Sequence, residues 1–407
     1  MISEKDKSIV RELAKQYMAI VDTDKQRAMF KRMQDSNDLK IVRPPVLLDE
    51  IPWYQMNMNG ELDCVCENER ARKVEDYFRK KLFYLKHFKA DNLCEPFFRV
   101  ARTIHSTGMG IEYKATDLKR TDDKNNIVSR EYEDVLEDES ALELMHDPEF
   151  SLDPEKDAQN MEFYTELLGD SIPIRQYGFG YLYYAPWDKI TTLRGVEPIL
   201  IDMYDRPEYL HKIIAKYESA AHKQLDFVEQ NLDVDCIPSL HCTPSMVSGM
   251  EGKGLKSTWF RTMAQSFGII SPEMFKEFEL DYLYSIAERF AYTYYGCCEP
   301  LDDKIELLKT IPNLRKIGCS PWANVECCAE QIGGDYVLAR KPNPAFVAIN
   351  TDPDVIREET ERSVKAALKY GCPTEFVLKD ISTVSHKPEN LIVWAQTVSD
   401  VLDKYYG

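Results

Sequence analysis

The chain has 407 residues and a formal net charge of −18, with 44% hydrophobic and 29% charged residues. No apolar run approaches the roughly 18 residues of a membrane span, and Lys and Arg do not form the basic stripe that nucleic-acid binding requires. We therefore expect an ordinary globular protein with no membrane and no nucleic-acid partner.

The N-terminus and the cysteines favour a cytoplasmic location. Residues 1–7 lack the apolar core of a signal peptide. Eleven cysteines in a chain of this length, without such a signal, argue against a disulfide framework, and the paired Cys-x-x-Cys motifs of a zinc ribbon are missing. We expect free thiols, some of them candidates for binding a metal.

The first half of the chain predicts helical additions followed by three strands. Residues 1–42 place Ile9, Leu13 and Tyr17 near helical spacing and form an N-terminal helical extension. Between about 119 and 160 the composition becomes strongly acidic, which predicts a solvated surface insertion. The three strands are predicted after Arg43, at 96–105 and at 172–180.

The second half alternates strands and helices more regularly. Ser271 and Pro272 have the sequence of a helix start. The five further strands are predicted at 233–242, 291–298, 314–319, 336–341 and 375–380. Eight strands separated mostly by helical patterns favour a (β/α)8 TIM barrel over residues 43–407, rather than a doubly wound sheet.

The segment 291–300 is the most informative motif. It predicts an aromatic strand that runs out into Cys297, Cys298 and Glu299. Strand ends carry the chemistry of parallel α/β proteins, and thiols beside a carboxylate offer donors that zinc accepts. Inert packing of buried cysteines is the alternative interpretation.

From about residue 170 to the end, the sequence resembles the uroporphyrinogen decarboxylase superfamily, which includes cobalamin-dependent methyltransferases. The landmarks, in order, are residues 195–208, residues 269–278, the strand at 291–300, and Pro388-Glu-Asn-Leu before the last helix. The resemblance implies a TIM barrel whose site lies at the strand ends.

Two positions favour the methyltransferase branch, which is O-demethylase-like, over the decarboxylase. The paired arginines that hold the decarboxylase's substrate are absent, because residues 53–60 read Trp-Tyr-Gln-Met-Asn-Met-Asn-Gly. Methyltransferases of the superfamily bind zinc through His-x-Cys after the fifth strand and Cys after the eighth. Cys298 matches the first thiol, whereas Gly296 stands at the histidine and Asp380 near the second thiol.

The resemblance therefore implies a changed metal site. Cys298, Glu299 and Asp380 would supply sulfur and oxygen ligands, and His241 or Cys242 would complete four. Cys319, at the end of the sixth predicted strand, is a further ligand candidate.

Glu299, Lys341 and Asp380 are the catalytic candidates. Lys341 could bind a substrate carboxylate or phenolate, or be a surface lysine. The side chains predicted to line a flat substrate pocket are Trp53, Tyr54, Asn57, Tyr177, Tyr181 and Trp187. Aromatic residues after strands favour an aryl methyl ether as substrate, although such residues more often belong to a core.

These observations predict an enzyme that moves a methyl group from a methoxylated small molecule to the cobalamin of a separate corrinoid protein, with zinc as Lewis acid. The partner must supply the cobalamin, because the chain lacks the Asp-x-His-x-x-Gly pattern. A metal-independent decarboxylase or lyase acting on a small carboxylate, and a barrel without activity, stay open as alternatives. The sequence allows a homodimer without requiring one.

Overall fold

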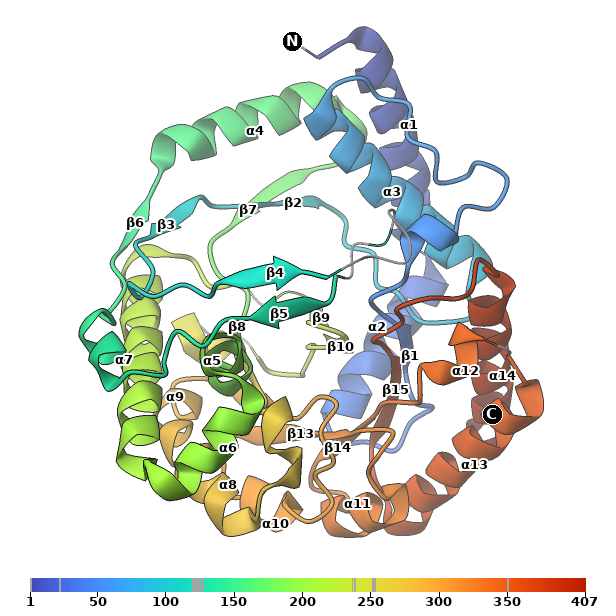
Figure 1. Cartoon of the computed structure of the whole chain (residues 1–407). Coiled ribbons are helices and arrows are strands. Elements are labelled where there is room, and N and C mark those ends of the chain that lie inside the picture. Colours follow the sequence, from blue (N-terminus) through green and yellow to red (C-terminus); the bar gives the residue numbers. More distant parts are fainter. Residues whose placement is uncertain are drawn as a thin grey trace.

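The computed structural model describes residues 2–21, 23–118, 125, 128–235, 237, 239–250, 254–349 and 351–407. Its centre is a curled sheet of seven parallel strands in the order β1-β15-β14-β13-β12-β11-β8, with helices around its outside (Figure 1). The strands of this sheet are β1 (Val46–Leu48), β8 (Leu182–Tyr184), β11 (Trp259–Thr262), β12 (Tyr292–Tyr295), β13 (Leu314–Cys319), β14 (Val337–Arg340) and β15 (Thr374–Leu378). This architecture confirms the predicted TIM-barrel-like α/β fold.

Helices connect most of these strands. The Ser271-Pro272 helix start is confirmed, because the Ser271 hydroxyl accepts a hydrogen bond from the Met274 backbone N–H at 3.3 Å. The α-helices are α1 (Glu4–Val21), α2 (Asp24–Asn37), α3 (Glu69–His87), α4 (Pro154–Leu168), α5 (Pro186–Arg194), α6 (Val196–Asp205), α7 (Pro207–Asn231), α8 (Pro272–Phe278), α9 (Tyr284–Ala287), α10 (Ile305–Leu308), α11 (Val325–Ile332), α12 (Ala345–Ala348), α13 (Pro353–Tyr370) and α14 (Glu389–Tyr406).

The parallel ladder is interrupted between β1 and β2 (Phe98–Ala101). β2 pairs in parallel with β7 (Ile174–Tyr177), and the chain then continues from β7 into β8. On its other side β1 pairs with β15, so in the described residues no ladder joins β1 to β2. The barrel wall is therefore open at this point.

Side chains take the place of a neighbouring strand at the free edge of β1. The Val46 backbone N–H donates to Asp91 Oδ2 at 2.9 Å, and the Leu48 N–H donates to the Tyr84 hydroxyl at 3.0 Å. The Tyr84 hydroxyl in turn donates to the Asp91 carbonyl at 3.2 Å. Buried backbone groups need such partners, so the gap in the ladder does not leave these amides unsatisfied.

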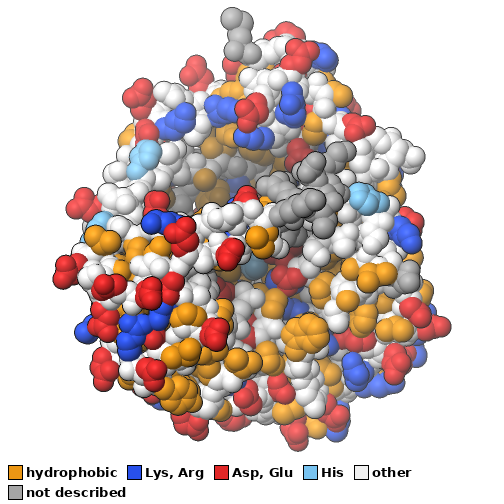
Figure 2. Space-filling view, viewed as in Figure 1, with side chains coloured by type: hydrophobic (Ala, Val, Ile, Leu, Met, Phe, Trp, Pro, Cys, Tyr) orange, Lys and Arg blue, Asp and Glu red, His pale blue; other side chains and the backbone are white. Residues whose placement is uncertain are grey.

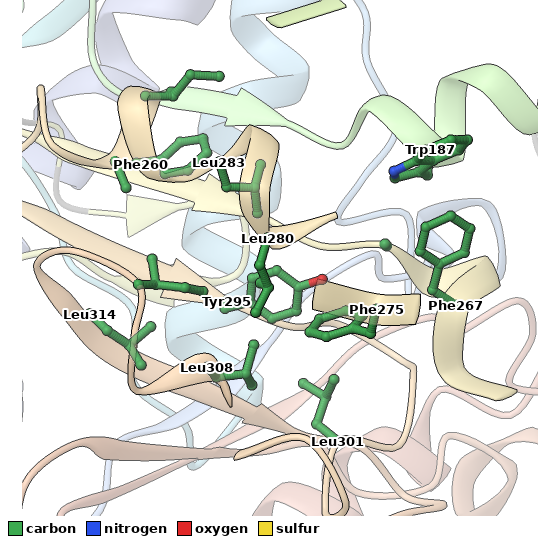
Figure 3. Close-up of a cluster of buried hydrophobic side chains, with 14 of the residues drawn as sticks. Trp187, Phe260, Phe267, Phe275, Leu280, Leu283, Tyr295, Leu301, Leu308 and Leu314 are labelled. Carbon is green, nitrogen blue, oxygen red and sulfur yellow. The ribbon is translucent and has the colours of Figure 1, made fainter. Parts of the chain in front are cut away.

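The two faces of the sheet differ in composition. Phe260 and Tyr295 point outward into the apolar layer beneath the helices, where Trp187, Phe275 and Leu308 also pack (Figure 3). Residues that alternate with the outward ones point inward, and on β13 and β15 they include a buried ion pair, in which Lys316 Nζ lies 2.7 Å from Glu375 Oε2. This alternation follows from the two-residue period of a strand.

The predicted fourth strand at 233–242 is wrong. Only Val234 forms an isolated parallel bridge, to Phe179, and β9 (Ser239–Leu240) and β10 (Thr243–Pro244) form a short antiparallel hairpin. Cys236 and Pro238 lie outside the described residues. Two strands of the central sheet were not predicted: β8, which lies beyond the end of the strand predicted at 172–180, and β11, which pairs with β8 and β12. The other seven predicted strands all overlap strands of the structure.

The acidic segment from about 119 to 160 lies largely on the surface. Residues 119–124, 126 and 127 are outside the described part of the chain. The remainder contributes to exposed antiparallel pairs, in which β4 (Ala115–Asp117) joins β5 (Arg130–Tyr132) and β3 (Ile104–Ser106) joins β6 (Phe150–Leu152), and to the first half of α4. Figure 2 shows a hollow in the molecular surface between α4 and the β4–β5 hairpin.

Candidate functional site

Gly296 turns the chain sharply at the end of β12. Its φ angle is +102°, and a Cβ atom at this position would lie 2.5 Å from Leu301 Cδ1 and 3.2 Å from the Gly318 nitrogen. Only glycine fits such a backbone without strain. The turn delivers Cys297, Cys298 and Glu299 to the carboxyl end of the sheet.

Two thiols, a lysine and a carboxylate meet there and form what we name the thiol cluster: Cys297, Cys298, Lys379 and Asp380. The Cys298 thiol donates to Asp380 Oδ2 at 2.9 Å, and the two sulfur atoms are 3.7 Å apart. Lys379 Nζ lies 2.7 Å from the same Asp380 oxygen and 3.6 Å from the Cys298 sulfur. The cluster thus joins the ends of β12 and β15.

Positive charge dominates the surroundings of the cluster. The contact between the two thiols, together with the charges of Lys341, Arg261 and Lys379, lowers the pKa of the Cys297 thiol in spite of its burial. The same contact raises the pKa of Cys298. Burial alone would lower the pKa of Lys379, but the two thiols and Asp380 outweigh it and raise that pKa. Cys297 is consequently the more acidic thiol of the pair.

Glu50 and His241 extend the cluster toward β1. Glu50 Oε2 accepts a hydrogen bond from the Asp380 backbone N–H at 2.7 Å, and His241 Nε2 lies 3.7 Å from Glu50 Oε1. The bond with His241 lowers the pKa of Glu50 to about 2. Cys242 and Glu50 together raise the pKa of His241 to about 9, so this histidine is a cation at neutral pH.

The four predicted zinc ligands are brought together only in part. Cys298 and Asp380 are in contact, whereas Glu299 turns back so that its Oε2 accepts the Cys297 backbone N–H at 2.9 Å. Two of these residues keep a buried polar atom without a hydrogen-bond partner, namely Glu299 Oε1 and His241 Nδ1. Burial raises the pKa of Glu299 to about 7.

These donors fit zinc in their chemistry. Thiol, imidazole and carboxylate groups are its usual ligands, and an orphaned buried donor is the kind of atom that a metal satisfies. Within the described residues, no three His, Cys, Asp or Glu side chains are already arranged so that they could hold a metal ion. Holding zinc would therefore require Glu299 and His241 to turn toward Cys298 and Asp380.

A second group of charged side chains lies inside the barrel. Lys341 Nζ donates to the Tyr294 hydroxyl at 2.7 Å, and the Arg261 guanidinium lies 3.9 Å from the centre of the Tyr294 ring. Both cations are almost fully buried, and Arg261 Nε lacks a hydrogen-bond partner. Lys341 is therefore an interior residue and not the surface lysine of the alternative interpretation.

A cavity of about 520 Å³, which we name the side cavity, lies where the ladder is interrupted between β1 and β2. Its walls come from α3, β1, β2, β7 and the β9–β10 hairpin, and His241 and Asp49 are among the lining residues. A smaller opening lined by Trp53 and Glu50 shares Lys81 and Asp49 with it. His241 and Glu50 connect these spaces to the thiol cluster.

The predicted pocket residues are scattered. Tyr177 lines the side cavity, Trp53 lines its outer opening, and the Tyr181 hydroxyl accepts the His241 backbone N–H at 2.8 Å. Tyr54 packs its ring edge-on against His386, and Asn57 is exposed and bonded to Asp63.

The prediction for Trp187 is wrong. Its indole is fully buried in the outer core, where Nε1 donates to the Phe278 carbonyl at 2.9 Å (Figure 3). Cys319 likewise belongs to the outer core and lies beside Arg340, away from the thiol cluster.

Sequence reasoning missed Lys379, Arg261 and Glu50. Lys379 could have been predicted, because it directly follows β15 and continues the alternation that places Glu375, four residues earlier, inside the barrel. Arg261 belongs to β11, which was not predicted. Glu50 follows β1 directly, but a glutamate after a strand carries no specific signal.

No protein-family model and no curated protein matches the sequence. Among solved structures, a methyltransferase from Methanosarcina mazei has a TM-score of 0.51 and 13% identity, over 93% of this chain and 99% of that chain. A B12-independent methionine synthase from Shewanella sp. W3-18-1, in complex with selenomethionine, has a TM-score of 0.35 and 12% identity, over 74% and 77% of the two chains. The Methanosarcina structure supports the fold assignment. None of the described helices has both the length and the apolar character needed to cross a bilayer.

Proposed function

We propose that the protein transfers a methyl group from a methoxylated small molecule to the cobalamin of a separate corrinoid protein. The observation that carries the proposal is the thiol cluster, which gathers soft and hard donors at the strand ends of a barrel. The likeness to the Methanosarcina methyltransferase over 93% of the chain agrees with it in fold. A cytoplasmic location belongs to the same proposal.

The difficult step in such a transfer is breaking the bond between the methyl group and the ether oxygen, because that oxygen is a poor leaving group. We assign Cys298, Glu299, Asp380 and His241 as the residues that would hold zinc. A zinc ion bound there supplies a Lewis acid for the departing oxygen.

Side chains of the protein also stabilise the negative charge that develops on the departing oxygen. Lys379 Nζ lies 3.6 Å from the Cys298 sulfur and carries a positive charge. This cation favours negative charge that develops on a leaving oxygen nearby, and burial strengthens the effect. We assign this role to Lys379 together with the predicted Lys341, whereas the predicted Glu299 and Asp380 act as zinc ligands.

The proposal is tested by metal analysis and by methylation of free cob(I)alamin, followed by its absorbance. We expect one zinc per chain, loss of activity with a chelator and recovery with added zinc. Cys298→Ala and Asp380→Ala should each lose about 100-fold or more in rate. The matched control is Cys327→Ala, a half-buried thiol on α11. A zinc-free chain whose methyl transfer ignores chelators would exclude the metal, and absence of methyl transfer from any methoxylated donor would exclude the function.

One observation favours the rival metal-independent decarboxylase or lyase. Among the described residues, neither Arg261 nor Lys341 forms an ion pair with a carboxylate, and both lie inside the barrel. A small carboxylate substrate would satisfy them. Release of CO2 from such a substrate by the metal-free protein would identify this activity in place of methyl transfer.

A further inference from the structure

The side cavity has the size and walls of a site for a small aromatic molecule. Its volume of about 520 Å³ falls within the range of roughly 300–1,000 Å³ that is typical of ligand sites. Seven aromatic side chains line it: Tyr17, Tyr77, Tyr84, Phe97, Phe98, Tyr164 and Tyr177. Such walls favour a flat ring, which packs edge-on or offset against them.

Lys81 is the cation on these walls that lacks a carboxylate partner. Its Nζ donates to Asn92 Oδ1 at 2.7 Å, and no described Asp or Glu oxygen lies within the 4.0 Å of an ion pair. Burial lowers the pKa of Lys81, and the more distant charges of Cys94, Glu95 and Asp49 offset this effect only in part. An anion beside it would restore the balance.

The other charged groups of the cavity are engaged elsewhere. Arg99 pairs with Glu95 and Asp235, and Lys73 pairs with Glu69. Asp91 is held by Arg32 and by the Val46 backbone N–H. Asp49 remains. Burial raises its pKa, and although its charge acts on Lys81 from a distance, the two side chains form no ion pair.

We propose that the side cavity binds the methyl donor and that Lys81 pairs with a carboxylate on its aromatic ring. The donor class is therefore methoxylated aromatic carboxylic acids. This inference rests on the proposed function, because it names the substrate of the same site. His241 on the cavity wall and Glu50 beside it lead from the bound ring to the thiol cluster.

Calorimetric titration of the full chain with 3-methoxybenzoate and with its neutral amide, 3-methoxybenzamide, tests the inference. The acid should bind about 10-fold or more tightly than the amide, because a charge-assisted hydrogen bond is stronger than a neutral one. Lys81→Met should weaken acid binding about 10- to 100-fold and leave amide binding unchanged. Unchanged amide binding also shows that the variant keeps its cavity. The control Lys86→Met removes an exposed charge from the same helix, one that pairs with Glu61.

Three results would overturn the inference: equal affinity for acid and amide, an acid preference that survives Lys81→Met, or no binding of either ligand. Failure of the proposed function gives a different result. In that case the acid binds with the expected dependence on Lys81, but no methyl group reaches cob(I)alamin.

Discussion

The outer and inner faces of the parallel sheet belong to the same strands and are built on different chemistry. In β11 and β12 the outward residues Phe260 and Tyr295 enter a continuous apolar layer, whereas the inward residues Arg261 and Tyr294 form a polar stack. Burial of apolar area stabilises the outer layer without directional demands. A charged side chain on the inner face instead depends on a particular partner. Removing that partner by mutation should therefore destabilise the fold more than an equally small change in the outer layer.

The largest effect is expected from breaking the inner ion pair. Glu375→Leu leaves Lys316 buried without its carboxylate, and the Pro244 carbonyl at 2.7 Å and the Thr243 hydroxyl at 3.4 Å remain as neutral partners. We expect a loss of about 3 to 5 kcal/mol in the free energy of unfolding, measured with urea. The double variant Lys316→Met with Glu375→Leu should recover most of this loss. Additive losses in the double variant would contradict a coupled pair.

A smaller effect is expected from a cavity in the outer layer. Leu308→Ala on α10 removes a fully buried side chain and should cost about 3 kcal/mol of unfolding free energy. Because the change lies outside the sheet, the affinity for 3-methoxybenzoate should stay as in the unmodified chain. A change in that affinity would show that the two faces are not independent.

The smallest effect concerns the buried acid of the outer layer, Glu279. Burial raises its pKa well above the ordinary 4.5, although the Tyr295 hydroxyl donates to Oε1 at 3.2 Å. The protonated form therefore contributes stability that is fully present below about pH 4.5 and is lost as the pH rises toward the folded-state pKa. Glu279→Gln should match the unmodified chain at pH 4.5 and exceed it by at least about 1 kcal/mol at pH 8. Urea unfolding at both pH values measures this, with exposed Glu288→Gln as the control. Equal stabilities at pH 8 would contradict the prediction.

The fold was largely predictable because its strands carry periodic apolar residues that helical patterns separate. β11 was not predicted because it has only four residues and includes the charged Arg261. The segment 233–242 was mistaken for a strand because it is apolar, although His241 has a φ of +53° and turns the chain. Local composition does not reveal that β11, which is short and carries a charge, belongs to the central sheet, whereas the longer segment 233–242 does not.

Part of the candidate site was predictable for a related reason. The ends of β12 and β15 place Cys298 and Asp380 together, because the carboxyl ends of parallel strands meet at the same end of a curled sheet, even with β13 and β14 between them. The position of Trp187 was not predictable. Trp187 lies in the first turn of α5, which directs its ring into the outer core and away from the barrel mouth. The side cavity depends on a missing ladder, which no single segment encodes.

The free edge of β1 has one more consequence. An unpaired strand edge is a template on which another chain can add a strand, and this is a common route to aggregation. Here Asp91 and Tyr84 already occupy the Val46 and Leu48 amides that a foreign strand would need. The wall is thus open to a small molecule and closed to a second polypeptide, and loss of either side chain would expose the protein to edge-to-edge association.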